Sequence, residues 1–116
     1  MITITCPIDK RLHAHNSGNW RQKASAVKQA RQLAMLLALE SSNGKLAGRC
    51  VVDYLFFVPD KRRRDAANLI QSCKPILDGV VDSGLIPGDH WEVLAIGKVD
   101  VVLGKRLEVQ LTFRAA

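Results

Sequence analysis

The chain has few aromatic residues and few cysteines, and it contains no Cys/His metal-binding pattern. Aromatic residues make up 5% of its 116 positions. The three cysteines, Cys6, Cys50 and Cys73, lie far apart and form no CxxC pair, which argues against both a disulfide framework and a zinc site. We therefore expect buried, reduced thiols, because a free cysteine usually behaves as a small apolar core residue.

Long apolar runs are also missing. No stretch reaches the ~18 consecutive apolar residues that a membrane-spanning helix needs, so we expect no contact with a membrane. The N-terminal sequence MITITCPIDK lacks the basic region and long apolar stretch of a secretory signal, which predicts a cytoplasmic protein. With 116 residues and a hydrophobic content of 47%, the chain is expected to form one domain, residues 1–116, around its own core.

Acidic residues are in the minority. The chain has 11 Asp and Glu against 17 Lys and Arg, which gives a net charge of +6. A basic balance on so small a domain is typical of a nucleic-acid-binding protein. The charge is densest where Lys61, Arg62, Arg63 and Arg64 run directly into Asp65. A run of cations alone is as often a solvated surface as a DNA contact, so the neighbouring carboxylate is the more informative feature.

The hydrophobic pattern predicts an α/β fold, with a small mixed β-sheet in the chain order β-α-β-α-β-β and two helices packed on it. Residues 2–7 alternate as a half-buried strand, and residues 50–58 form the most strand-like run. The C-terminal region is predicted to be a β-hairpin that turns at Gly104. In its last strand Leu107, Val109, Leu111 and Phe113 share one face.

Two helices are predicted. The first covers residues 20–40 and is expected to end at Gly44. Its apolar face is expected to hold Ala24, Val27, Ala34, Ala38 and the leucines at 33, 36, 37 and 39. The second is expected to begin with Ser72 as its N-cap, to contain Pro75 in its first turn and to end at Gly84.

Three carboxylates fall near the ends of predicted elements. Asp65 follows a strand, Asp78 lies on the second helix, and Asp89 lies in the loop behind it. Carboxylates brought together repel one another unless a cation lies between them, and oxygen ligands suit Mg²⁺ or Mn²⁺ rather than Zn²⁺. Such ions catalyse phosphodiester cleavage. Spacing alone leaves plainer interpretations open, namely that Asp78 pairs with Lys74 on the helix surface and that Asp89 is a turn residue.

The order of these residues resembles that of a known nuclease family. The run PDKRRRD, with Asn68 three residues after its last Asp, is followed by KPILDG, DSGLIP and GDHWEV. The early segment PIDKRLHAHNSGNWRQKA also looks like the family's N-terminal segment. Together they resemble the RusA-type Holliday junction resolvases, crossover-junction endodeoxyribonucleases common in phages and prophages, and the likeness covers most of the chain.

The resemblance implies a homodimeric DNA recombination and repair nuclease, in the cytoplasm of a bacterium or phage-infected host. Such an enzyme binds four-way or branched DNA and makes paired, symmetric nicks with Mg²⁺ or Mn²⁺. Catalytic roles are implied for Asp65, Asp89 and Lys74. The implied metal ligands are Asp65, Asp78 and Asp89. DNA contacts are expected from Lys61, Arg62, Arg63, Arg64, Arg21, Lys23 and Asn68.

The chain departs from the family pattern at two acidic positions. The usual Asp-x-Asp-Asn reads DAAN here, with Ala67 in place of the second acid, and the usual pair of loop acids reads DH, with His90 as its second member. His90 is therefore either a metal ligand, a proton carrier or an inert loop residue. Glu92, Asp78 or Asp82 could stand in for a missing acid. These substitutions support an alternative, a catalytically degenerate junction- or nucleic-acid-binding protein.

Several other residues permit weaker inferences. Trp20 and Trp91 could stack on an unpaired base, although Trp20 is expected in the core. His13 and His15 either touch phosphate or face solvent. A small basic RNA-binding protein is the more distant alternative, because charge alone does not distinguish one nucleic-acid backbone from another.

Overall fold

The computed structural model describes residues 1–12, 20–41 and 45–116. The elements in chain order are β1 (Ile2–Pro7), the 3-10 helix η1 (Lys10–Leu12), α1 (Trp20–Ser41), β2 (Cys50–Val58), α2 (Ala66–Ser72), α3 (Lys74–Ser83), β3 (Leu94–Leu103) and β4 (Glu108–Ala115). The predicted helix end at Gly44 and the candidates His13 and His15 lie outside the described residues. Within the described ranges, no helix is both long and apolar enough to cross a membrane.

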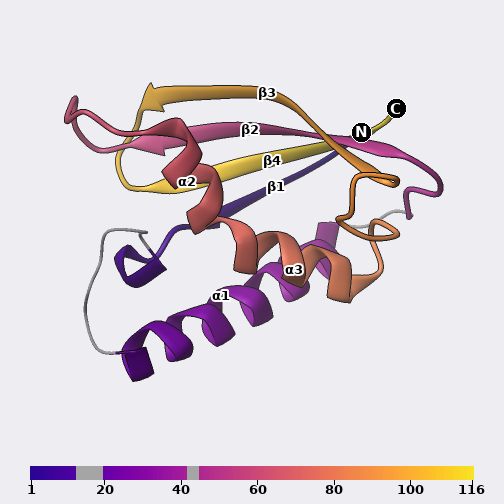
Figure 1. Cartoon of the computed structure of the whole chain (residues 1–116), viewed down its shortest axis with the longest axis horizontal. Coiled ribbons are helices and arrows are strands. Elements are labelled where there is room, and N and C mark those ends of the chain that lie inside the picture. Colours follow the sequence, from indigo (N-terminus) through magenta and orange to yellow (C-terminus); the bar gives the residue numbers. More distant parts are fainter. Residues whose placement is uncertain (13–19, 42–44) are drawn as a thin grey trace.

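The four strands form one mixed sheet, so the predicted α/β class is confirmed. Its strand order is β1-β4-β2-β3. The central strand β4 pairs antiparallel with β1 and β2, whereas β3 pairs parallel with β2. Helices α1 and α3 lie together on one side of the sheet, and β3 is the strand farthest from α1 (Figure 1). The core fills the space between the sheet and these helices, with Val52, Phe56, Leu111 and Phe113 fully buried.

The predicted C-terminal hairpin is wrong, because β2 lies between β3 and β4 in the sheet. The chain leaves β3, passes the end of β2 and enters β4 on the other side. At this crossing the Gly104 N–H donates to the carbonyl oxygen of Val58 over 2.8 Å. A Cβ on Gly104 would lie 2.8 Å from the Cβ of Phe57. The crossing therefore needs a residue without a side chain. Glycine is required at position 104 for this reason, and not because the chain makes a hairpin turn there.

The buried face of α1 also differs from the prediction. Its buried residues are the alanines at every fourth position, Ala26, Ala30, Ala34 and Ala38. Several residues predicted to face the core are exposed instead, namely Ala24, Leu33, Leu36 and Leu39. The cause is the close approach of α3, where a Cβ on Gly79 would lie only 2.2 Å from the carbonyl oxygen of Arg31. Only small side chains fit such a contact, so the alanines are buried and the leucines lie outside it.

The second predicted helix is divided into α2 and α3. Asp65 caps α2, because its Oδ1 accepts a hydrogen bond from the Ala67 N–H over 2.8 Å. Ser72 was predicted as an N-cap, but it is the last residue of α2, and its hydroxyl donates to the carbonyl oxygen of Asn68. The prediction is wrong because the Asp65 cap starts an additional helical segment. Helix α3 ends, as predicted, at Gly84, which has a φ of 81°.

All three cysteines are buried and unpaired, as predicted. Burial raises the pKa of Cys6 to about 11 and also raises the pKa of Cys73. Thiols with raised pKa values stay protonated at neutral pH and are poor nucleophiles. The cysteines therefore act as small core residues.

Helices α1 and α3 are also joined by an ion pair at their surface. Arg31 Nε lies 2.5 Å from Asp82 Oδ2, and Arg31 Nη2 lies 2.8 Å from Asp82 Oδ1. These hydrogen bonds lower the pKa of Asp82 below its ordinary value of 3.8. A carboxyl group whose pKa is lowered on folding stabilises the fold above its unfolded pKa. That contribution is lost as the pH falls through the folded value.

We predict that Asp82→Asn lowers the urea midpoint of unfolding at neutral pH. Its difference from the wild type should shrink as the pH falls below the ordinary carboxyl value of 3.8 and be lost as the pH passes through the lowered pKa of Asp82. Urea titrations across this range measure the effect. A double-mutant cycle with Arg31→Gln is the control, because the coupling between the two positions should vanish over the same pH range. A difference that stays constant down to the lowest pH would contradict the role assigned to this ion pair.

Candidate active site

The first residue of α3 lies between two carboxylates. Lys74 Nζ donates to Asp78 Oδ1 over 2.9 Å, and it also donates to Asp89 Oδ2 in the loop after α3. The side chain of Lys74 is 57% exposed, whereas those of Asp78 and Asp89 are 28% and 30% exposed. We call these three residues the Lys74 cluster. It brings together three of the residues for which chemistry was predicted, whereas Asp65 and His90 have other partners.

Helix geometry and loop anchoring place the two acids. Asp78 follows Lys74 by four residues, so the two side chains lie on the same helix face. The loop that carries Asp89 is anchored before it by the buried Leu85 and Ile86. After it, the carbonyl oxygen of His90 accepts hydrogen bonds from two backbone N–H groups at the start of β3. Core side chains and backbone bonds therefore hold Asp89 next to the first turn of α3.

The charges of the Lys74 cluster support one another. The hydrogen bond from Lys74 lowers the pKa of Asp89 below its ordinary value of 3.8, and the nearby Asp78 carboxyl contributes a smaller part. The contacts with Asp89 first, and then with Asp78, raise the pKa of Lys74 above 10.5. At neutral pH Asp89 is therefore ionised and Lys74 is protonated.

The donor set of the Lys74 cluster is compatible with a hard divalent cation. Mg²⁺ prefers oxygen ligands and is often held by one or two carboxylates together with water and substrate phosphates. Asp78 and Asp89 offer two carboxylates that converge on a single positive charge, the Lys74 ammonium. The residues present therefore fit Mg²⁺ or Mn²⁺ by ligand type and by convergence.

Asp65 lies apart from the Lys74 cluster. It caps the start of α2, and the seven residues of α2, about 10 Å at 1.5 Å per residue, separate it from the beginning of α3. Across residues 1–12, 20–41 and 45–116, no group of three or more His, Cys, Asp or Glu side chains is arranged to hold a metal ion. The folded chain thus brings two of the three predicted metal ligands together and places the third at the far end of α2.

The residues considered as substitutes for the missing acids have other neighbours. His90 Nδ1 lies 4.0 Å from Glu92 Oε1, and both side chains are largely exposed. Asp82 is bound to Arg31 of α1. A residue eight positions after Lys74 lies about 80° further round the helix. This rotation turns Asp82 toward α1 rather than toward the loop of Asp89.

The predicted DNA-contact residues before α2 fall into two groups. Lys61, Arg62 and Arg63 are exposed. The Arg64 side chain is only 9% exposed, and its Nη1 donates to Asp60 Oδ1 over 2.9 Å and to two backbone carbonyl oxygens of the same loop. Arg64 therefore fixes the loop that presents the other three cations. Its pairing was missed, although an Asp four residues before an Arg is a detectable signal.

The remaining predicted contacts lie at the start of α1 and on α2. The Arg21 guanidinium lies 5.4 Å from the centroid of the Trp20 ring, within cation–π range. Lys23 is exposed and Asn68 is partly buried. Trp20 was predicted in the core but is 73% exposed, because the buried face of α1 begins only at Ala26. The start of α1 therefore presents an aromatic ring together with cations.

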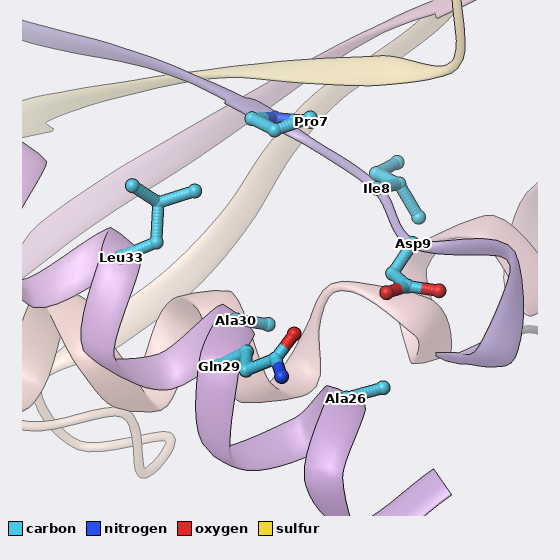
Figure 2. Close-up of a pocket in the computed structure, with 7 residues that line it drawn as sticks. All are labelled: Pro7, Ile8, Asp9, Ala26, Gln29, Ala30 and Leu33. Atoms are coloured by element: carbon cyan, nitrogen blue, oxygen red, sulfur yellow. The ribbon is translucent and has the colours of Figure 1, made fainter. Parts of the chain in front are cut away.

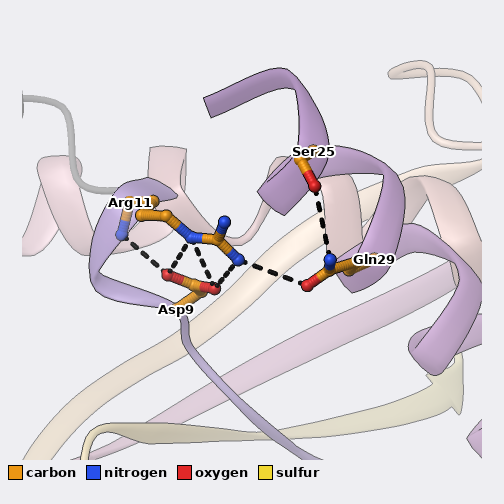
Figure 3. A network of polar contacts seen from close by, with 4 residues as sticks. All are labelled: Asp9, Arg11, Ser25 and Gln29. Atoms are coloured by element: carbon orange, nitrogen blue, oxygen red, sulfur yellow. Dashed lines mark hydrogen bonds and ion pairs between the residues drawn. The ribbon is translucent and has the colours of Figure 1, made fainter. Parts of the chain in front are cut away.

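A hollow of about 230 Å³ lies between the end of β1 and α1. Its walls are Pro7, Ile8, Asp9, Ala26, Gln29, Ala30 and Leu33 (Figure 2). The polar groups at its rim are already bonded to neighbours. Arg11 Nη2 donates to Asp9 Oδ2 over 2.7 Å and to Gln29 Oε1 over 3.2 Å, and Gln29 Nε2 donates to Ser25 (Figure 3). The hollow shares no residue with the Lys74 cluster.

Comparison with known proteins adds no family to this geometry. No protein-family model matches the chain, and no curated protein matches it either. The likeness to RusA-type resolvases therefore stays a prediction based on the quoted motifs.

Proposed function

We propose that this protein is a divalent-metal-dependent, structure-specific DNA endonuclease of the RusA type. As a homodimer it would resolve Holliday junctions and other branched DNA by paired, symmetric nicks. The observation that carries the proposal is the convergence of Asp78 and Asp89 on Lys74. The basic composition of the chain and the exposed cations at residues 61–63 support it.

Each residue of the Lys74 cluster would have a role that follows from its charge. Asp78 and Asp89 would hold Mg²⁺ or Mn²⁺ together with water. Such an ion supplies an activated water and stabilises negative charge during phosphodiester hydrolysis. Lys74, protonated at neutral pH, would donate hydrogen bonds to the negative charge that develops on the phosphate. The exposed cations Lys61, Arg62 and Arg63 would hold the DNA backbone.

A gel assay on a labelled four-way junction with an immobile core tests the proposal. We expect paired, symmetric nicks near the branch point in Mg²⁺ or Mn²⁺, none in EDTA and none on a matched linear duplex. A junction-selective shift without nicks under any divalent ion would contradict the nuclease proposal.

Two charge-neutralising variants test the site. Asp89→Asn is expected to abolish cleavage and to leave junction binding intact or tighter, because less negative charge faces the phosphates. The family resemblance implies a catalytic role for Asp65, so Asp65→Asn is expected to abolish cleavage. The fold should be retained, because asparagine caps a helix as well as aspartate does. Cleavage assays and gel shifts measure both effects. Wild-type cleavage by Asp65→Asn alone would leave Asp65 as a helix cap and confine the chemistry to the Lys74 cluster.

A second candidate is a junction- or nucleic-acid-binding protein without catalysis. The observation that favours it is the meeting of only two carboxylates in the described structure, with Ala67 and His90 at the positions where the family has acids. Tight, structure-selective binding without nicks would support this candidate. Equal affinity for single-stranded RNA, duplex DNA and junctions would instead indicate binding through charge alone.

A further inference from the structure

The two edges of the sheet differ in what they expose. The edge strand β1 alternates its buried residues with Thr3, Thr5 and Pro7, which face solvent. The other edge strand, β3, exposes aliphatic side chains on both faces, with Ile96 58%, Val101 44%, Val102 42% and Leu103 56% exposed. No strand of the described chain covers the outer edge of β3 (Figure 1). Proteins normally protect long apolar edge strands, since their free backbone groups and side chains favour pairing with another strand.

The charges of β3 are arranged to complement a second copy of β3. Lys98 and Asp100 are its only charged side chains, and both are exposed. If two β3 strands pair antiparallel about a two-fold axis at Val99, each Lys98 faces the Asp100 of the other copy. Moving the two-fold axis by one residue, from Val99 to Asp100, would place the two Asp100 side chains opposite each other, which is unfavourable. The register at Val99 also brings the partly buried Val99 and the exposed Val101 of both copies into one apolar row.

Helix α1 is the other exposed apolar surface, and its net charge argues against it as the dimer interface. Helix α1 exposes Leu33, Leu36 and Leu39, but it carries four cations and one acid, which is a net charge of +3. Two such helices would repel each other, in a chain that already has a net charge of +6. The charged side chains of β3, one Lys and one Asp, sum to zero. The β3 edge is therefore the apolar surface on which two copies meet without this cost.

We infer that the outer edge of β3 is the homodimer interface, formed by antiparallel pairing of β3 with its symmetry mate about Val99, which joins the two sheets into one. The contact is isologous, because the same strand serves both copies. β3 is regular from Val99 to Leu103, whereas Gly97 and Lys98 together lie opposite Asp53 of β2 as a bulge, so the pairing extends over part of its ten residues. This inference rests on the proposed function, because paired nicking needs a second copy of the chain. Its measurement does not, because oligomeric state can be determined without DNA.

The test is sedimentation velocity on the full chain at micromolar concentrations without DNA. Lys98→Asp and Asp100→Lys each place like charges opposite one another at two positions per dimer, so each is expected to raise the dimer dissociation constant by about tenfold or more. The combined Lys98→Asp/Asp100→Lys variant restores opposite charges and is expected to return the constant to within about threefold of the wild type. Circular dichroism of the single variants separates this rescue from misfolding, because positions 98 and 100 also lie on one face of the same strand.

The matched control compares two leucine-to-lysine substitutions at similarly exposed positions, one on β3 and one on α1. Leu103→Lys on β3 is expected to give a monomer, whereas Leu36→Lys on α1 is expected to leave the dimer intact. A monomeric wild type, or dissociation by Leu36→Lys but not by Leu103→Lys, overturns the inferred interface. Junction cleavage by that same wild-type protein would leave the proposed function standing, so the two failures can be told apart.

Discussion

Gly79→Ala is expected to lower the free energy of unfolding by about 1–3 kcal/mol, the usual range for an overpacked core. An added Cβ would lie 2.2 Å from the carbonyl oxygen of Arg31, 2.8 Å from the Cβ of Ala34 and 3.0 Å from the backbone nitrogen of Met35. The first and third of these atoms belong to the backbone of α1, so the two helices would have to move apart. In an exposed helix the same substitution stabilises by about 1 kcal/mol, and the sign of the effect therefore reports on this contact.

Equilibrium unfolding in urea measures the effect, and Ala34→Gly supplies a sharper comparison. Removing the Ala34 Cβ relieves only one of the three close contacts. The combined Gly79→Ala/Ala34→Gly variant is therefore expected to be no more stable than Gly79→Ala. Recovery in the combined variant would mean that the side chain, and not the backbone of Arg31, sets the distance between the helices. Unchanged or increased stability of Gly79→Ala would contradict the close helix contact itself.

The α1–α3 contact also explains why the face of α1 could not be predicted from sequence. Periodicity identifies a helix, but hydrophobicity favours leucine over alanine as the buried residue. The packing inverts that preference, because Gly79 brings α3 within reach of the α1 backbone and leaves room only for methyl groups. The decisive residue lies 45 positions after Ala34, which is outside any local window of sequence.

The pairing of the strands could not be predicted from local sequence either. The alternation along β4, with Val109, Leu111 and Phe113 buried, was predicted and is confirmed. Alternation determines which face of a strand is buried, but it does not identify the neighbouring strand. The short connection after β3 suggested a hairpin, whereas the structure inserts β2 between β3 and β4. The close contact of Gly104 with Phe57 identifies that crossing only once the fold is known.

One contact of the candidate site could be predicted from residues close in sequence, whereas the other depends on residues far apart in sequence. The pairing of Lys74 with Asp78 follows from a spacing of four residues on a helix, and the structure has it. The approach of Asp89 to Lys74, 15 residues away, was expected only from the family resemblance. It depends on the loop anchored by Leu85 and Ile86. The capping role of Asp65 was missed because α2 itself was not predicted as a separate helix.

Lys74→Met is expected to reduce junction cleavage by at least about 10²-fold, as removal of one group that stabilises transition-state charge does in other enzymes. The same variant is expected to bind Mn²⁺ more tightly than the wild type in the absence of DNA. Lys74 Nζ lies against both carboxylates, so its removal takes away a positive charge that competes with the ion. The fold should be little affected, because exposed ion pairs contribute at most about 1 kcal/mol.

Single-turnover cleavage and Mn²⁺ titration by electron paramagnetic resonance separate the two effects. Lys105→Met, at an exposed position between β3 and β4, is the matched control and should leave both measurements unchanged. Asp89→Asn should lose cleavage and also bind Mn²⁺ more weakly, because it removes a ligand rather than a competitor. Opposite changes in Mn²⁺ affinity for these variants would identify the Lys74 cluster as the ion site. If neither variant changes that affinity, the ion binds elsewhere, and Asp78 and Asp89 only hold Lys74 in place.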